Sequence, residues 1–148
     1  MSVAAKFGSA IEEAERALSG VSEDEAAQPA RPGGWLRKEE LGHLLDSAQN
    51  NHQRIVLAAL NGVFAGPEYA QNDWVDLHGY RDMRWADILA FWIARNQMLH
   101  RVIARIREER LVAPVIIGES PAMSLRDWID DYLQHLAGHV AQITATRQ

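Results

Sequence analysis

Two histidines near the C-terminus have a type and spacing that suggest chemistry. His135 and His139 lie four residues apart in a segment with the apolar spacing of a helix. Both imidazoles would project from one helical face, with Cβ atoms about 6 Å apart. Imidazole nitrogen is a common ligand of zinc and related metals, so the pair could share one divalent ion. The same spacing also arises by coincidence on packed or exposed helices, so a metal site requires a third ligand.

Four other histidines could supply that ligand, and two of them lie in one predicted helix. His52 falls on the apolar stripe of this helix, whereas His43 falls nearly opposite, beside polar residues. Periodicity alone favours His52, although His52 could equally be a core histidine satisfied by one hydrogen bond. His43 would face a polar cavity only if this helix were covered on both sides. The residue pattern leaves the choice open.

Four segments with helical periodicity must position these side chains. Their apolar residues recur at i, i+3, i+4 and i+7, and strand-like alternation is absent. Asp82 is a candidate N-cap of the third helix, and Ser124 with Asp127 forms a capping pair for the fourth. The predicted helices cover residues 3–19, 37–60, 84–110 and from 124 nearly to the C-terminus.

The connection between the second and third predicted helices, residues 61–82, is longer than neighbouring helices of a bundle usually need. It has no clear period, and we expect it to cross the bundle lengthwise. These features predict an all-α fold, a four-helix bundle with a long crossover connection between helices two and three. The length predicts a single domain over residues 1–148.

The composition limits the chemistry and the partners. The chain has no cysteine, which excludes disulfides, thiolate ligands and a catalytic Cys. Its formal charge is −5 and it has no basic block, so we expect no nucleic-acid partner. No stretch approaches the roughly 18 apolar residues of a membrane span, and no signal peptide is recognisable. We expect a cytoplasmic protein that acts on a small molecule without a membrane partner.

Three segments resemble the DinB-like, damage-inducible family. They are PGGWLRKEELGHLLDSAQNNHQR, NDWVDLHGY with RWADILAFWIARNQMLHRVIARI, and SLRDWIDDYLQHLAGHVAQI, which together span nearly the whole chain in order. The resemblance implies a metal-binding four-helix bundle. In that family the histidine of the Gly-His-Leu segment and both histidines of the Tyr-x-x-His-x-x-x-His segment bind a divalent ion, often nickel or zinc. These positions match His43, His135 and His139, so the resemblance favours His43 over His52.

Two positions near the start of the second helix depart from the family pattern. Leu36 stands where a capping serine is frequent, and Glu40 where an apolar residue is common. Glu40 and His43 form one E-x-x-H motif, whereas a di-iron bundle needs a pair of them. Leu-Ala-Gly separates the two C-terminal histidines, without the glutamate of H-E-x-x-H metalloproteases.

The resemblance also narrows the reaction. Family members with an assigned activity are transferases and isomerases that use low-molecular-weight thiols, which implies a thiol co-substrate here because the chain has no Cys. A site of three histidines with an open position could instead activate water. We therefore expect a metal-dependent thiol S-transferase or hydrolase. The alternative is a non-catalytic small-molecule-binding or dimerisation module whose metal is structural or absent.

Residues beyond the ligands stay unassigned. Glu39, Asp46 and Asp131 are close enough in sequence to orient a histidine or to accept a proton, although each could equally be a solvated helix charge. Tyr132 could offer a hydroxyl to a ligand or could belong to the core. Helical bundles often associate through an apolar flank, so we also expect a homodimer.

Overall fold

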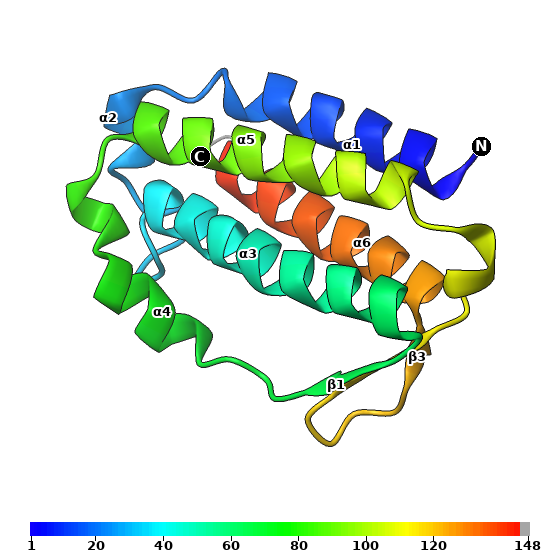
Figure 1. Cartoon of the computed structure of the whole chain (residues 1–148). Coiled ribbons are helices and arrows are strands. Elements are labelled where there is room, and N and C mark those ends of the chain that lie inside the picture. The colour runs from blue at the N-terminus through cyan, green and yellow to red at the C-terminus, as the bar shows by residue number, and fades with distance from the viewer. Residues whose placement is uncertain (146–148) are drawn as a thin grey trace.

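Four long helices form the body of the computed structural model, which describes residues 1–145 (Figure 1). Both α1 and α3 pack against α5 and against α6, so the order around the bundle is α1, α5, α3, α6. This arrangement confirms the predicted four-helix bundle. The four helices are α1 (Val3–Leu18), α3 (Arg37–Asn61), α5 (Trp85–Ala104) and α6 (Leu125–Thr144).

The long connection between α3 and α5 crosses the bundle lengthwise, as the sequence predicted. Because α3 and α5 run in the same direction, the chain must return along the whole bundle between them (Figure 1). This crossover contains β1 (Phe64–Gly66), α4 (Gln71–His78) and the 3-10 turn η1 (Tyr80–Asp82). All three elements contact α3. As a result α3 is covered on more than one face, and it buries charged and polar residues along much of its length.

A small sheet closes one end of the bundle, where the sequence showed no strand pattern. Its order is β1, β2 (Pro114–Ile117), β3 (Met123–Ser124), with β1 parallel to β2 and β3 antiparallel to β2. Strands this short are too brief for alternation of polar and apolar residues to be recognised. The third long helix also ends earlier than predicted, at Ala104, and a 3-10 turn η2 (Glu108–Arg110) follows it.

The residue that caps α5 differs from the prediction, and the reason is a contact with a distant part of the chain. Asp82 lies in η1, and the N-cap position belongs to Arg84, which contributes no side-chain cap. The free N–H groups of Trp85 and Ala86 instead donate to the carboxylate of Glu23 at 2.8 and 3.0 Å. Glu23 begins the short helix α2 (Glu23–Ala26), which no sequence pattern had indicated. The predicted cap of α6 is confirmed, because Asp127 N–H donates to Ser124 Oγ at 3.1 Å.

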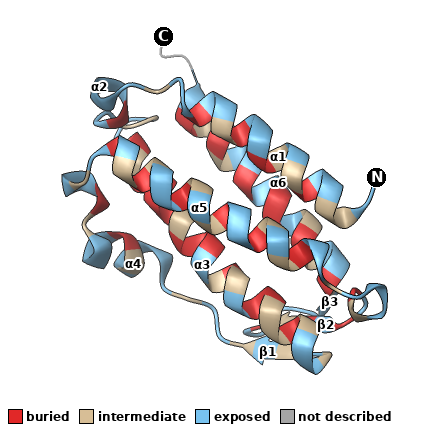
Figure 2. Ribbon diagram, turned by 45° about the horizontal axis from the view of Figure 1, so that its top comes forward, coloured by how far each residue is buried: buried red, intermediate tan, exposed pale blue. Residues whose placement is uncertain are grey.

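The buried residues lie mainly on the sides of the long helices that face one another (Figure 2). The largest include Trp92 and Phe7, both fully buried. The buried residue Asn96, which interrupts the apolar stripe of α5, accepts a 2.6 Å hydrogen bond from the Tyr132 hydroxyl. Within residues 1–145, no helix combines the length and the hydropathy that crossing a bilayer requires.

Candidate metal centre

Helices α3 and α6 bring three histidines together. His43 projects from α3, and His135 and His139 project from successive turns of α6. One ligand nitrogen from each ring lies within 4.8 Å of the other two, and the Nε2 atoms of His135 and His139 are 3.1 Å apart. Two nitrogens bound to one tetrahedral zinc ion are about 3.3 Å apart, because each bond is about 2.0 Å long. The three rings are therefore spaced to hold one ion.

The structure also shows why His43, and not His52, joins this cluster. His43 is only 1% exposed, because the crossover covers the face of α3 that the helical wheel had marked as polar. His52 is half-buried elsewhere on α3, where burial, followed by the charge of Arg95, lowers its pKa. The remaining histidines are also apart, since His78 contacts Asp46 and His100 stacks on Phe7.

The local environment favours the neutral imidazoles that bind metals. Burial, followed by the nearby His139 and His135, lowers the pKa of His43 to about 4. Partial burial and His139 also lower the pKa of His135, against an opposing effect of Asp131. The Nδ1 atom of His43 is buried and has no hydrogen-bond partner among residues 1–145. Neutral imidazoles are common ligands of zinc and nickel, so this donor set fits a divalent ion.

A buried carboxylate supports one of the three rings. Glu40 is 4% exposed, and its Oε1 lies 2.9 Å from Nδ1 of His139. Such a contact places a proton on Nδ1 and leaves Nε2 free as a ligand, as in the carboxylate–histidine–metal arrangements of many metalloproteins. In the sequence, Glu40 departs from the family pattern and forms one E-x-x-H motif with His43, but neither feature predicts its contact with His139. The sequence feature that could have pointed to Glu40 is its position three residues before His43, which places both side chains on one face of α3.

The carboxylates considered from the sequence lie in three different settings. Glu39 accepts the N–H of Leu36 at 2.9 Å and so satisfies the start of α3, where a serine cap is missing. Asp46 is buried, and accepts hydrogen bonds from Tyr80 at 2.6 Å and His78 at 2.9 Å. Of these three, only Asp131 lines the cleft beside the histidines.

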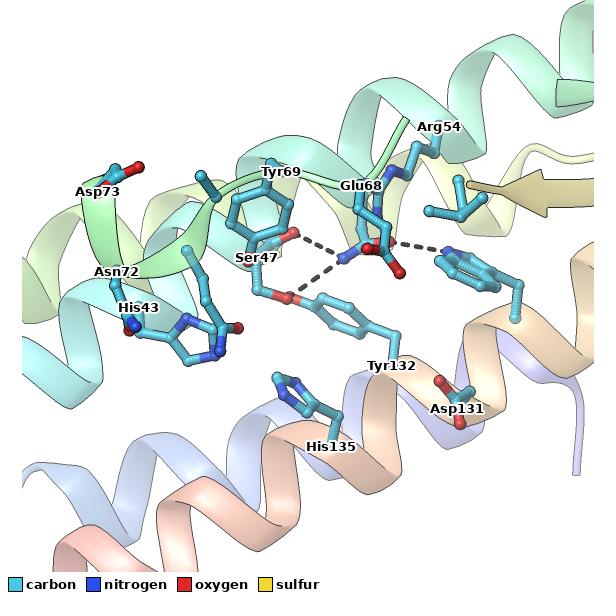
Figure 3. A pocket seen from close by; sticks show the side chains of 15 residues that line it. His43, Ser47, Arg54, Glu68, Tyr69, Asn72, Asp73, Asp131, Tyr132 and His135 are labelled. Carbon is cyan, nitrogen blue, oxygen red and sulfur yellow. Dashed lines mark hydrogen bonds between the residues drawn. The ribbon is translucent and has the colours of Figure 1, made fainter. Parts of the chain in front are cut away.

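The histidine cluster lies between two cavities. A cleft of about 740 Å³ runs between α3 and α6 under the chain segment 68–73, and Figure 3 shows His43 and His135 at one end of it. A smaller cavity of about 390 Å³ on the other side is lined by Trp35, Glu40 and all three histidines. Tyr132 also lines the cleft, but its hydroxyl is engaged by Asn96 in the core. A ligand could therefore reach the cluster, with Tyr132 contributing mainly its ring.

A crossover four-helix bundle with a histidine cluster between α3 and α6 defines the class of this protein. The chain belongs to the DinB superfamily, whose family model matches residues 7–143. The fold is similar to that of YfiT from Bacillus subtilis, described as a probable metal-dependent hydrolase with an unusual four-helix bundle topology. The two structures superpose with a TM-score of 0.82 at 19% identity, over 95% of this chain and 83% of YfiT. A comparison with curated proteins finds no match.

Proposed function

We propose that this protein is a metal-dependent enzyme acting on a small molecule, with His43, His135 and His139 as the ligands of one divalent ion. The observation that carries this proposal is the convergence of three ligand nitrogens within 4.8 Å at the end of an open cleft. Three imidazole ligands leave a coordination position for a substrate or co-substrate. A bound ion would act as a Lewis acid and lower the pKa of the attacking group, whether water or a thiol.

The protein's own residues have separate tasks in this proposal. Glu40 holds His139 in the orientation and tautomer that present Nε2. Asp131 lies in the cleft near His135 and is placed to accept a proton from the attacking group. The cleft volume of about 740 Å³ is in the range of small-molecule sites.

Two reaction classes are supported by different observations. Hydrolysis is supported by the likeness to YfiT, which is described as a probable metal-dependent hydrolase. Thiol transfer is supported by the resemblance to thiol-dependent members of the family, and the thiol would have to come from a co-substrate because the chain has no cysteine. Nickel and zinc are the ions we propose, since both accept imidazole ligands. The expected homodimer stays a prediction, which light scattering of the purified protein would test.

Activity of the loaded protein tests the proposal. Protein loaded with zinc or nickel is assayed with a thiol plus a chlorodinitrobenzene electrophile, and separately with a small activated ester. We expect turnover in one assay that disappears after chelation and in His135→Ala, and that persists in His52→Ala. A tightly bound ion with no turnover in either assay would favour the alternative, a non-catalytic binding module.

A further inference from the structure

A buried arginine lines the same cleft as the histidines. Arg54 projects from α3 eleven residues after His43, which is about three helical turns. It is only 8% exposed, and Figure 3 shows it at the end of the cleft opposite His43 and His135. Arginine is rarely buried to this extent unless its charge is paired.

The hydrogen bonds of Arg54 differ from those of the other buried arginine in α3. Arg37 is fully committed to the fold, because it donates to four backbone carbonyls. Arg54 donates to the Pro67 carbonyl at 3.2 Å and, at 3.5 Å, to Asn51 Oδ1. These contacts use two of the five N–H donors of a guanidinium. Arg54 therefore keeps free N–H donors for a ligand, whereas the donors of Arg37 connect backbone segments of the fold.

The guanidinium of Arg54 is held in place by its neighbours. Its central carbon lies 5.8 Å from the ring centroid of Tyr69 and 5.8 Å from that of Trp128, within cation–π range. Asn51 is itself fixed, because its Oδ1 accepts a 2.8 Å hydrogen bond from Trp128 Nε1 and its amide donates to Ser47. A group held this way loses little freedom when a ligand binds.

The charge of Arg54 has no partner within ion-pair distance in residues 1–145. None of the ion pairs in this part of the chain includes Arg54. The exposed Glu68 raises the pKa of Arg54 through its charge, but it forms no ion pair with Arg54. Burial of an unpaired cation is costly, and an anionic group of a ligand would offset that cost.

We propose that Arg54 binds the carboxylate of an elongated small molecule whose reacting group lies at the histidine cluster. A carboxylate matches the planar fork of a guanidinium and can accept two parallel hydrogen bonds. Phosphate could use the same donors, but Glu68, Asp73 and Asp131 also line the cleft and would repel a dianion more strongly than a monoanion. Trp128 and His135 are seven positions apart on α6, a rise of about 10 Å, which sets the scale of the ligand.

The assignment of the reacting group rests on the proposed function, whereas the carboxylate contact can be tested without any metal. The chelated protein is titrated with hexanoate, with the uncharged hexanamide and with inorganic phosphate. Binding is followed by calorimetry and by tryptophan fluorescence. We expect hexanoate to bind more tightly than the other two. Arg54→Gln should weaken hexanoate binding by roughly 10- to 100-fold, the usual loss for a charged hydrogen-bonded pair.

Two further variants keep the test valid even if Arg54→Gln folds poorly. Arg54→Lys keeps the charge but loses the fork, so it should bind hexanoate several-fold more weakly. Glu68→Gln removes an exposed competing anion and should bind it more tightly. Arg81, which is exposed and outside the cleft, provides the matched control Arg81→Gln, in which affinity should not change. Equal hexanoate affinity in the wild type, Arg54→Lys and Glu68→Gln would overturn the proposal.

A parallel titration separates this inference from the proposed function. His135→Ala should still bind hexanoate, and Arg54→Lys should still bind zinc. Hexanoate binding that requires zinc and ignores Arg54 would mean that the carboxylate coordinates the metal, and the inference would fail while the metal site stands. Hexanoate binding at Arg54 without zinc binding in any variant would keep the carboxylate contact and reject the metal site.

Discussion

Glu40 and His139 meet across the interface of α3 and α6, with the carboxylate Oε1 at 2.9 Å from the imidazole Nδ1. With its amide nitrogen turned toward Glu40, Gln142 donates to the same oxygen at 2.8 Å. Because Glu40 is buried, this contact is shielded from water and fixes both the angle and the tautomer of the ring. The contact thus connects the packing of two helices to the geometry of the histidine cluster.

Glu40→Gln should therefore weaken metal binding without unfolding the protein. Loss of such a supporting carboxylate typically costs about 10- to 100-fold in metal affinity. The affinity is measured by competition with a chromophoric chelator, alongside helical circular dichroism. Glu39→Gln is the matched control, since Glu39 caps α3 and should change stability but not affinity. Unchanged affinity in Glu40→Gln would show that the carboxylate has no role in the site.

Gly42→Ala should destabilise the protein, although alanine is the better helix former by about 1 kcal/mol. A Cβ atom at Gly42 would overlap the ring of Tyr80, so the crossover could not pack against α3 as it does. Overpacking of this kind costs about 1–3 kcal/mol. Gly138→Ala is the control, because nothing lies within 4 Å of its Cβ position, and this variant should be stabilised. Urea unfolding compares the two variants. A stabilised Gly42→Ala would contradict the close packing of Tyr80 against Gly42.

Asn96→Leu should cost about 1–3 kcal/mol of unfolding free energy, because it leaves the buried hydroxyl of Tyr132 without its acceptor. Tyr132→Phe in the same background removes that hydroxyl and should recover part of the loss. A double-mutant cycle by urea unfolding measures the coupling. Additive effects of the two substitutions would mean that the hydrogen bond contributes nothing to stability.

The metal-free protein should lose stability as the pH falls from about 6.5 toward 4. In the unfolded chain His43 binds a proton near its ordinary pKa of 6.5, whereas in the folded protein its pKa is about 4. Protons therefore favour the unfolded state within this window, at a cost of up to about 3 kcal/mol. His43→Gln cannot titrate, so its unfolding free energy should fall less over the same range. If the unfolding free energies of the two proteins fell equally with pH, the lowered pKa of His43 in the folded protein would be contradicted.

The four helices could be predicted because each carries a long apolar stripe, which is a local signal. The local cap of α6 at Ser124 could also be predicted, whereas the cap of α5 and the strands could not. Glu23 caps a helix 62 residues away, and Phe64 pairs with Val115 across about a third of the chain, so a local pattern cannot show their partners.

The candidate site shows the same division between local and non-local information. The pairing of His135 with His139 follows from helix geometry alone. Periodicity favoured His52 as the third residue of the cluster, because a helical wheel assumes one buried face, whereas α3 is also covered by the crossover. Family resemblance favoured His43 as the third ligand, and His43 lies in the cluster with His135 and His139. The role of Glu40 depends on a contact with α6 and was missed.

The most direct test of the proposed metal site is the metal content of the tag-free protein after chelation and reloading with zinc or nickel. Three proteins are compared: the wild type, His43→Ala and His52→Ala, each checked for helical circular dichroism. We predict about one ion per chain in the wild type and in His52→Ala, as three imidazoles complete one site, and no retained ion in His43→Ala. Retention of the ion by folded His43→Ala, or its loss from folded His52→Ala, would contradict the assignment.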